Sequence, residues 1–222
     1  HTTRAFFVNC LTRRLGLDVE TRPDAFNLNA VLAATRKGPR TTENFPFEVQ
    51  YGYHFDSGLL GAFLRERACG MGVQHRQGRI ARVAQRESGE LQALHTDAGE
   101  VVEGDFFVDC TGFASLLSQQ TLGVRFESFG SNLFNDSAVV MPTPHSQPFL
   151  PETRSTALSA GWCWHIPLTS RIGNGYVYSS RYIDADAAEA ELRRHLGLTE
   201  SDVPARRLQM RTEASLRFER RA

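Results

Sequence analysis

The octapeptide GWCWHIPL, Gly161–Leu168, holds both tryptophans of the chain, two positions apart, followed by a proline. Residues two apart in a β-strand point to the same face, so Trp162 and Trp164 would form one broad, rigid aromatic wall. Pro167 lacks a backbone N–H and ends the predicted strand. Two indoles on one face are typical either of dense core packing or of a functional wall, and the octapeptide alone leaves both open.

Strands and one helix are predicted close to the octapeptide. Apolar and alternating runs predict strands over Ser137–Met141 and Tyr176–Tyr182. Gly173 and Gly175, which precede the second of these strands, indicate a hairpin turn. Residues 184–197 show helical spacing of apolar side chains between an initial aspartate and a final glycine, so they predict a capped amphipathic helix.

The first half of the chain has a different pattern of elements. Helical spacing predicts helices over residues 3–17, 29–36 and 57–72, the last of them capped by Asp56. The stretch from 79 to 103 alternates and contains an Asp-Ala-Gly turn, so it predicts a β-meander. The order of helix, meander and core strand indicates an α/β or α+β fold.

A short apolar strand, Phe106–Val108, is expected to end in a loop that can bind a ligand. The loop begins with Asp109, Cys110, Thr111 and Gly112. Small residues at the carboxyl end of a core strand leave the backbone open, and ligands bind at this edge of doubly wound sheets. An ordinary strand-to-loop turn is the alternative interpretation.

Composition and charge exclude several classes of partner. The 222 residues carry 25 basic and 25 acidic side chains, a balance that favours neither nucleic acid nor an acidic membrane surface as partner. No apolar run reaches the length of a membrane span. The four cysteines lie far apart, which predicts a reducing, cytoplasmic setting, and no spacing of histidines or cysteines predicts a metal site.

Several segments together resemble the flavin-dependent halogenases, in the family's order and roughly its spacing. Trp162–Pro167 matches the family signature W-x-W-x-I-P, and the resemblance extends over about residues 51–198. The other matching segments are YGYHFDSGLLGAFL (51–64), GDFFVDCTGFASLL (104–117), LFNDSAVVMPTP (133–144) and DADAAEAELRRHLGL (184–198).

The resemblance implies a flavin-monooxygenase-like fold, with a partial FAD-binding module over residues 1–125 and a second, substrate-facing sheet over residues 126–222. It implies that reduced FAD from a separate flavin reductase, oxygen and a halide (chloride or bromide) yield hypohalous acid. A lysine then activates this acid for attack by an aromatic small molecule, which is free or tethered to a carrier protein. The tryptophan wall would keep the substrate away from the flavin and so suppress monooxygenation.

The resemblance also assigns roles to individual residues. Lys37 is the only lysine but lacks the sequence context of the family's catalytic lysine, which is therefore not identified. Glu213 is a candidate for the family's late carboxylate, and Arg76 is a candidate FAD contact. The other candidates are the wall residues Trp162, Trp164, Ile166 and Pro167 and the FAD contacts Asp109, Thr111 and Gly112.

The sequence departs from the family at one important motif. The family's first strand and its G-x-G-x-x-G turn have no counterpart in the 222 residues. This predicts an incomplete chain, either ordered pieces of a longer protein joined together or a truncated relative. We expect a reduced-FAD-dependent halogenase for an indole, pyrrole or phenol type of substrate. The alternatives are a related flavin monooxygenase and a catalytically inactive relative.

Overall fold

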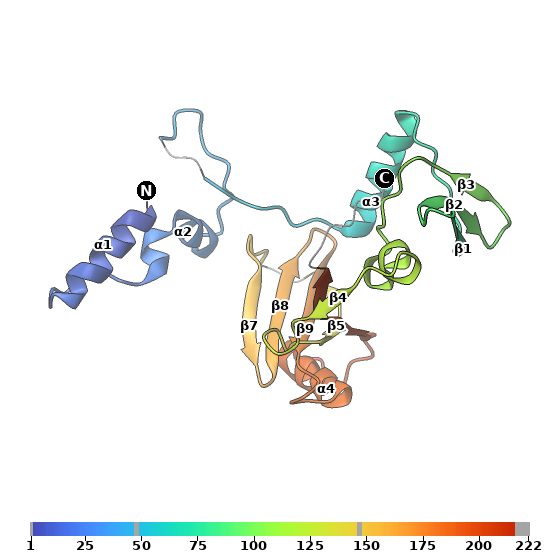
Figure 1. Ribbon diagram of the computed structural model, residues 1–222. Helices are drawn as coiled ribbons and strands as arrows, with labels where there is room; N and C mark the ends of the chain where they lie inside the picture. Colours follow the sequence, from blue (N-terminus) through green and yellow to red (C-terminus); the bar gives the residue numbers. More distant parts are fainter. Residues whose placement is uncertain (1, 47–48, 146–147, 216–222) are drawn as a thin grey trace.

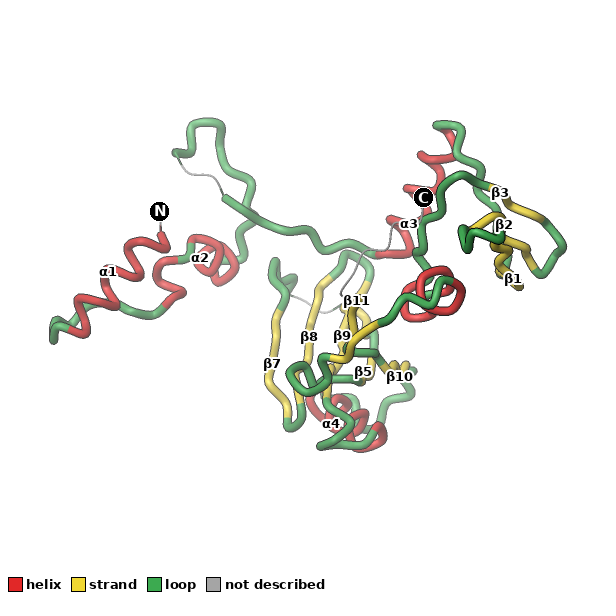
Figure 2. Tube along the Cα trace, in the orientation of Figure 1, coloured by secondary structure: helices red, strands yellow, loops and turns green. Residues whose placement is uncertain are grey.

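The computed structural model describes residues 2–46, 49–145 and 148–215. Most of its helices and strands form three groups joined by segments of loop (Figures 1 and 2), and a two-stranded sheet and two short helical turns lie outside them. The first group is a pair of N-terminal helices, the second is a helix followed by a three-stranded sheet, and the third is a central sheet backed by a helix. The chain is therefore a mixed α and β protein, as the sequence predicts.

The N-terminal group is held together by an aromatic contact. It contains α1 (Thr2–Arg14), the short 3₁₀ turn η1 (Pro23–Phe26) and α2 (Leu28–Ala34). The rings of Phe6 and Phe26 meet edge to face with their centroids 5.9 Å apart, a favoured geometry for an aromatic pair. Both helices confirm predicted ones, although each begins one residue earlier than predicted and ends two or three residues earlier.

The second group confirms the predicted helix and meander. Helix α3 (Ser57–Gly70) is capped by Asp56, whose carboxylate accepts hydrogen bonds from two backbone N–H groups of the first turn. An antiparallel three-stranded sheet follows. Its strands are β1 (Ile80–Gln85), β2 (Leu91–Thr96) and β3 (Val101–Glu103).

The central sheet is antiparallel throughout and contains the tryptophan octapeptide near one edge. Its strand order is β10-β5-β9-β8-β7, and β6 pairs with the beginning of β9. The strands are β5 (Ser137–Val140), β6 (Thr143–Pro144), β7 (Arg154–Leu158), β8 (Gly161–Pro167), β9 (Arg171–Tyr178) and β10 (Arg206–Gln209).

One face of the central sheet is covered by α4 (Ala185–Leu196), which Figure 1 shows beneath the strands. Ala188 and Leu192 of the helix are fully buried and belong to one core cluster with Cys163 and Tyr176 of the sheet. Because side chains alternate along a strand, burial of Cys163 on this side turns its two tryptophan neighbours to the other side.

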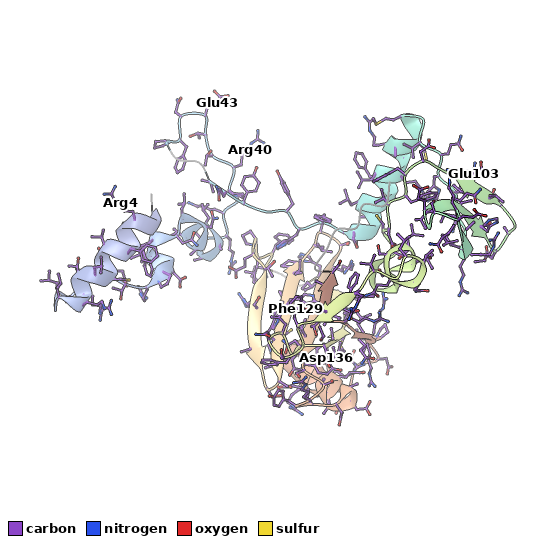
Figure 3. The ribbon with its side chains drawn as sticks, in the orientation of Figure 1. Arg4, Arg40, Glu43, Glu103, Phe129 and Asp136 are labelled. Carbon is purple, nitrogen blue, oxygen red and sulfur yellow. The ribbon has the colours of Figure 1, made fainter. Side chains whose placement is uncertain are left out.

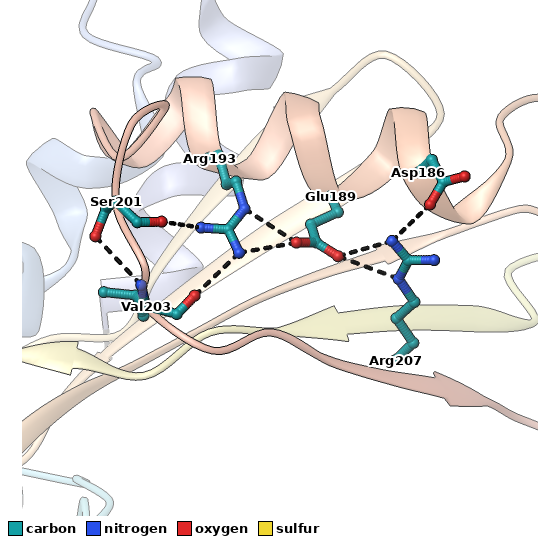
Figure 4. A network of polar contacts seen from close by, with 6 residues as sticks. All are labelled: Asp186, Glu189, Arg193, Ser201, Val203 and Arg207. Carbon is teal, nitrogen blue, oxygen red and sulfur yellow. Dashed lines mark hydrogen bonds and ion pairs between the residues drawn. The ribbon is translucent and has the colours of Figure 1, made fainter.

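A network of charged side chains fastens α4 to the edge strand β10 (Figure 4). Glu189 accepts hydrogen bonds from Arg207 at 2.9 and 3.1 Å and from Arg193 at 2.8 and 3.0 Å. Arg207 and Arg193 together hold the pKa of Glu189 below its ordinary value. Arg193 also donates to the carbonyl oxygens of Ser201 and Val203, so it ties the helix to the connection that leads to β10.

Asp136, labelled in Figure 3, joins three strands at one end of the central sheet. Its carboxylate accepts hydrogen bonds from the backbone N–H and the hydroxyl of Ser180, at 2.8 and 2.6 Å. Its carbonyl oxygen accepts from the N–H of Met210 at 2.7 Å. The start of β5 and the ends of β9 and β10 are therefore fixed by one residue.

The predicted core strand Phe106–Val108 is wrong. These residues form no helix or strand, and the Phe106 side chain is 84% exposed. A three-residue apolar run becomes a strand only when neighbouring strands pair with it and cover its faces. Strand β3 ends at Glu103, and within the described ranges no strand pairs with the run that follows.

The assignment of Gly173 and Gly175 to a hairpin turn is also wrong. Both glycines lie inside β9, opposite Ile166 and Trp164 of β8. The turn itself spans residues 169–170 and is closed by a hydrogen bond from the N–H of Leu168 to the carbonyl of Arg171. Glycine is rare inside strands, so the local pattern favours a turn, and only the cross-strand partner explains this exception.

Two leucines allow the contribution of the α4 core to be measured. We expect Leu192→Ala, which empties a fully buried position, to lower the free energy of unfolding by about 2–5 kcal/mol. Leu59→Ala on α3 is the matched control, since Leu59 is 69% exposed, and should change it by less than about 0.5 kcal/mol. Urea unfolding followed by tryptophan fluorescence measures both, because both tryptophans lie in the central sheet. Equal losses in the two variants would contradict this packing.

Candidate functional site

Strand β8 presents the two tryptophans on the face of the central sheet that α4 does not cover. The ring centroids of Trp162 and Trp164 lie 6.2 Å apart with 59° between the ring planes. Trp162 is 40% exposed and Trp164 is half-buried. The predicted same-face arrangement is therefore present, and the rings form a partly open aromatic surface.

The ring of Trp164 lies across a glycine of the neighbouring strand. Trp164 pairs with Gly175 in the register of β8 and β9, while Trp162 pairs with Val177. A Cβ atom built on Gly175 would overlap Cζ2 and Cη2 of the Trp164 ring. Gly175 is therefore required by the position of the indole, because any other residue would displace it.

The last residues of β8 continue the pattern and then end it. Ile166 follows Trp164 on the wall face by alternation and is half-buried. Pro167 is buried and is the last residue of the strand, as predicted. Its carbonyl oxygen is 2.9 Å from Nδ1 of His54, which connects the strand end to a segment far away in the sequence.

His165, which lies between the tryptophan wall and Pro167 in the sequence, faces away from the wall. Its Nδ1 is 2.8 Å from Oδ1 of the fully buried Asn174. The amide nitrogen of Asn174 donates to the Thr143 hydroxyl at 2.9 Å and to the Met141 carbonyl at 3.3 Å. Because Oδ1 accepts in this network, Nδ1 of His165 donates, and the imidazole has a structural role in joining strands.

Asp109 organises the second candidate region. Its carboxylate accepts hydrogen bonds from the Thr111 hydroxyl at 2.6 Å and N–H at 3.1 Å, and from the N–H groups of Leu117 and Ser118 at 2.9 Å each. Partial burial raises the pKa of Asp109, but the bonds from Thr111, Ser118 and Leu117 outweigh burial and hold it below its ordinary value. The ionised carboxylate therefore shapes the loop from within.

The loop after Asp109 leaves its backbone open. Gly112 has φ = +62°, a conformation that favours glycine, and no atom lies within 4 Å of where its Cβ would stand. It begins the short turn η2 (Gly112–Ala114), and the π-helical turn η3 (Leu116–Thr121) follows. The predicted loop is present, although the strand that was expected to lead into it is not.

A pocket of about 260 Å³ brings this loop together with residues about a hundred positions later. Strand β11 (Glu213–Ser215) pairs with β4 (Phe126–Ser128) and supplies the second wall. Glu213 and Arg211 line this wall, and their side chains lie 3.4 Å apart. The pocket is lined by Asp109, Gly112, Phe113, Gln119, Arg211 and Glu213, among others.

Several residues of this pocket were not recognised in the sequence, among them Arg211 and Gln119. Arg211 donates to Oε1 of Gln119 at 3.2 Å and so joins the two walls. Glutamine in a short turn carries no local signal of function. Arg211 stands two positions from the candidate Glu213, and that proximity is the only clue the sequence offers.

The structure does not bring Arg76 or Lys37 to this pocket. Arg76 lies in the loop after α3 and donates to the side chain of Gln74 at 3.2 Å. Its neighbour His75 lines a separate hollow beside α3. Lys37 lines another hollow, of about 580 Å³, which also includes His54. A cofactor contact for Arg76 stays a prediction without geometric support.

The pocket beside Asp109 fits part of a dinucleotide and not the whole. Its volume is below the roughly 300–1,000 Å³ of pockets that enclose a drug-sized ligand. The open backbone at Gly112 and the exposed ring of Phe113 leave room for a flat group, and the guanidinium of Arg211 lies among the carboxylates of Asp109 and Glu213. Among the residues that the structure describes, no group of three His, Cys, Asp or Glu side chains could hold a metal ion.

The family model for tryptophan halogenase matches residues 4–221. The chain is similar to the 7-chloro-L-tryptophan 6-halogenase KtzR of Kutzneria sp. (strain 744), with 40% identity over 167 residues, 74% of this chain and 32% of the relative. It is 34% identical over 203 residues to the tryptophan 7-halogenase RebH of Lentzea aerocolonigenes, covering 88% of this chain and 38% of the relative. The chain thus spans about a third of the length of these relatives.

Solved structures agree with this comparison. The chain is similar to BrvH, a flavin-dependent halogenase from Brevundimonas sp. BAL3, with 38% identity and a TM-score of 0.82 over 93% of this chain and 43% of that one. It is also similar to Xcc4156, a flavin-dependent halogenase from Xanthomonas campestris, with 37% identity and a TM-score of 0.81 over 96% of this chain and 42% of that one. None of the helices in the described part of the chain has the length and apolar character needed to cross a membrane. On these matches the chain belongs to the tryptophan halogenase family of flavin-dependent halogenases.

Proposed function

We propose that the protein is a halogenase that uses reduced FAD, oxygen and chloride or bromide to halogenate an electron-rich aromatic of the indole, pyrrole or phenol type. The observation that carries the proposal is the pair of indoles on the uncovered face of the central sheet, with Trp164 laid across Gly175. A core tryptophan needs burial, whereas Trp162 remains 40% exposed. Many other large apolar side chains of the chain are at least as exposed, so the placement of both rings on one uncovered face, and not the exposed fraction, favours the functional wall.

Two parts of the chain carry different tasks in this proposal. Residues 1–125 would belong to a partial FAD-binding module, and the part of the chain from residue 126 to residue 222 would contain the substrate-side sheet. Gly112 and Phe113 would hold one end of FAD, with Asp109 fixing the loop that presents them and Thr111 bound to that carboxylate. When bound and reduced, FAD would activate oxygen, and oxygen is the oxidant that turns halide into an electrophile. A flavin reductase would deliver the reduced cofactor.

The tryptophan wall would act by exclusion. Its face carries the two indole rings and Ile166, with no ionisable group among them, since His165 is turned to the other side. Wide, rigid aromatic side chains close a path to an organic ring while leaving room for a halide ion or a small neutral acid. Separation of the aromatic substrate from FAD would thereby suppress oxygen transfer to the substrate.

Glu213 is proposed as the carboxylate that acts near the reacting groups. Its side chain lines the pocket and lies 3.4 Å from Arg211 of the same wall, and Arg211 in turn donates to Gln119 of the opposite wall. The aromatic substrate would be free or tethered to a carrier protein. We propose a cytoplasmic location, where reduced flavin and the reductase are available.

The reaction itself is tested with the protein, FAD, a flavin reductase and NADH, with indole, pyrrole and phenol as substrates. We expect a product heavier by one halogen, with the isotope pattern of chlorine or bromine by mass spectrometry, that is lost when halide or reductase is omitted.

Two outcomes would contradict the proposal. A product with added oxygen and no halogen would indicate a flavin monooxygenase. Reduced FAD that binds and is consumed without any aromatic product, or FAD that does not bind at all, would indicate a catalytically inactive relative.

Because the ring of Trp164 occupies the space over Gly175, we expect alanine substitutions at two glycines of β9 to affect stability differently. We expect Gly175→Ala to displace the indole and destabilise the chain by about 1–3 kcal/mol, as overpacking does. Gly173→Ala is the matched control, because the nearest atoms to its Cβ would be 3.8 Å away. Acrylamide quenching of tryptophan fluorescence should rise in the first variant and stay unchanged in the second. Equal behaviour of the two variants would refute the role of Gly175.

The lowered pKa of Asp109 predicts a dependence on pH. A carboxyl group with a depressed pKa in the folded state contributes stability that is fully present above its unfolded pKa of about 3.9 and is lost as pH falls through the folded value. Asp109→Ala should therefore cost about 1–2 kcal/mol at pH 7, as the loss of a cap does, and progressively less below about pH 4. Thermal unfolding of both proteins from pH 3 to 7 measures the difference, and a constant difference would contradict the assignment.

A further inference from the structure

The segment that leads into α3 is fastened to the end of the tryptophan-bearing strand. Figure 1 shows this segment running from α2 to α3 along one end of the central sheet. Two of its residues, His54 and Asp56, make side-chain hydrogen bonds with residues 99 to 115 positions away. Hydrogen bonds between residues so far apart in the sequence belong to the tertiary structure, because no local turn or helix cap requires them.

His54 connects two strands at the same end of the sheet. Its Nδ1 lies 2.9 Å from the carbonyl oxygen of Pro167, which ends β8, and its Nε2 lies 3.0 Å from the hydroxyl of Thr153, which precedes β7. A carbonyl oxygen can only accept, so Nδ1 carries the proton and donates. In the neutral imidazole Nε2 then accepts from the Thr153 hydroxyl. The contacts therefore specify a single tautomer.

Asp56 divides its two carboxylate oxygens between helix and sheet. Oδ1 caps α3 by accepting from the N–H groups of Gly58 and Leu59 at 2.9 and 3.2 Å. Oδ2 accepts from Nη2 and Nε of Arg171, the first residue of β9, at 3.0 and 3.2 Å. The backbone bond from Leu59 and the bonds from Arg171 hold the pKa of Asp56 below its ordinary value. A cap alone would use only the first oxygen.

The two residues meet the two sides of one hairpin. Pro167 is the last residue of β8 and Arg171 is the first of β9. His54 therefore contacts the strand before the turn of the hairpin, and Asp56 contacts the strand after it. The tryptophan wall lies on the same strand as Pro167, only three to five residues earlier. Any shift of this strand end relative to α3 would therefore shift the wall as well.

We infer that His54 and Asp56 are positioning residues. Their hydrogen bonds hold the start of helix α3 against the β8–β9 hairpin, and this contact fixes the position of the tryptophan wall relative to α3. The inference rests on the proposed function for its catalytic consequence, since it supposes that the wall must face the flavin side at a fixed spacing. The claim that His54 and Asp56 join α3 to the hairpin depends only on their hydrogen bonds and not on the proposed function. The two residues are proposed to act only through the strand ends that they hold.

Conservative variants at His54 separate the two bonds of the imidazole. Asparagine places its amide nitrogen where Nδ1 stands, whereas glutamine reaches to the place of Nε2. We expect His54→Gln to raise amide exchange in the peptide Trp162–Leu168 by about fivefold, the effect of one lost hydrogen bond, while His54→Asn stays near the wild type. Hydrogen–deuterium exchange of the protein, read by mass spectrometry, measures both.

Variants at Asp56 separate its cap from its ion pair. Asp56→Asn keeps the cap, because asparagine caps as well as aspartate, but it weakens the bonds to Arg171. We expect slow exchange at the first turn of α3 to persist in this variant, with faster exchange at the start of β9. Arg171→Gln should act at the same place, and the double variant should be no worse than the single ones.

Three results would overturn the inference. The first is an unchanged exchange rate in the β8 peptide for His54→Gln. The second is a wild-type His54 that ¹⁵N NMR shows to be protonated at Nε2 and not at Nδ1. The third is an additive effect of Asp56→Asn and Arg171→Gln. If His54→Gln does not fold, Thr153→Val tests the same site, since it removes only the Nε2 partner and should leave the Nδ1 proton in place.

An activity measurement then tests the catalytic consequence separately. We expect His54→Gln, at an unchanged melting temperature, to lower the amount of halogenated product formed per reduced flavin consumed, and His54→Asn to restore it. If the wild-type protein makes no halogenated product, the proposed function fails. The exchange and NMR results still decide whether His54 and Asp56 hold α3 against the β8–β9 hairpin.

Discussion

The structure depends on one cross-strand contact, in which the indole of Trp164 lies over a residue of the next strand that has no side chain. The space for the ring exists only because Gly175 stands directly opposite in the register of β8 and β9. That register is in turn secured from the other face, where Cys163 and Tyr176 pack against α4. Because a one-residue slip would exchange the two faces of a strand, the buried face determines where the tryptophans point.

The tryptophan wall and the loop at Asp109 are held in shape by different interactions. The wall on β8 is apolar and rigid, and His165, which follows Trp164, is engaged with a buried asparagine on the other face. The loop at Asp109 is polar, and its shape depends on a carboxylate that accepts four hydrogen bonds from its own chain. A charged loop on one side and an uncharged barrier on the other suit the proposed reaction, in which the flavin and the organic ring have to be kept apart.

Features that depend on interactions within a few residues could be predicted from the sequence. Features that depend on contacts between residues far apart in the chain could not. The cap at Asp56, the meander and the common face of the tryptophans follow from hydrogen bonding and alternation within a few residues. The predicted strand at Phe106–Val108 is absent because a strand needs a partner that lies elsewhere. The glycines of β9, the second role of His54 and the gathering of Glu213 with Gly112 all depend on contacts that local spacing does not encode.

The continuity of β7, β8 and β9 has a consequence for the order of folding. These strands follow one another from residue 154 to 178 and pair as two successive hairpins, so the loops that must close are short. The bonds from His54 and Asp56 close loops of 113 and 115 residues, and longer loops cost more entropy and form more slowly. We therefore expect the two hairpins that carry the aromatic barrier to form before the long-range bonds from His54 and Asp56 do.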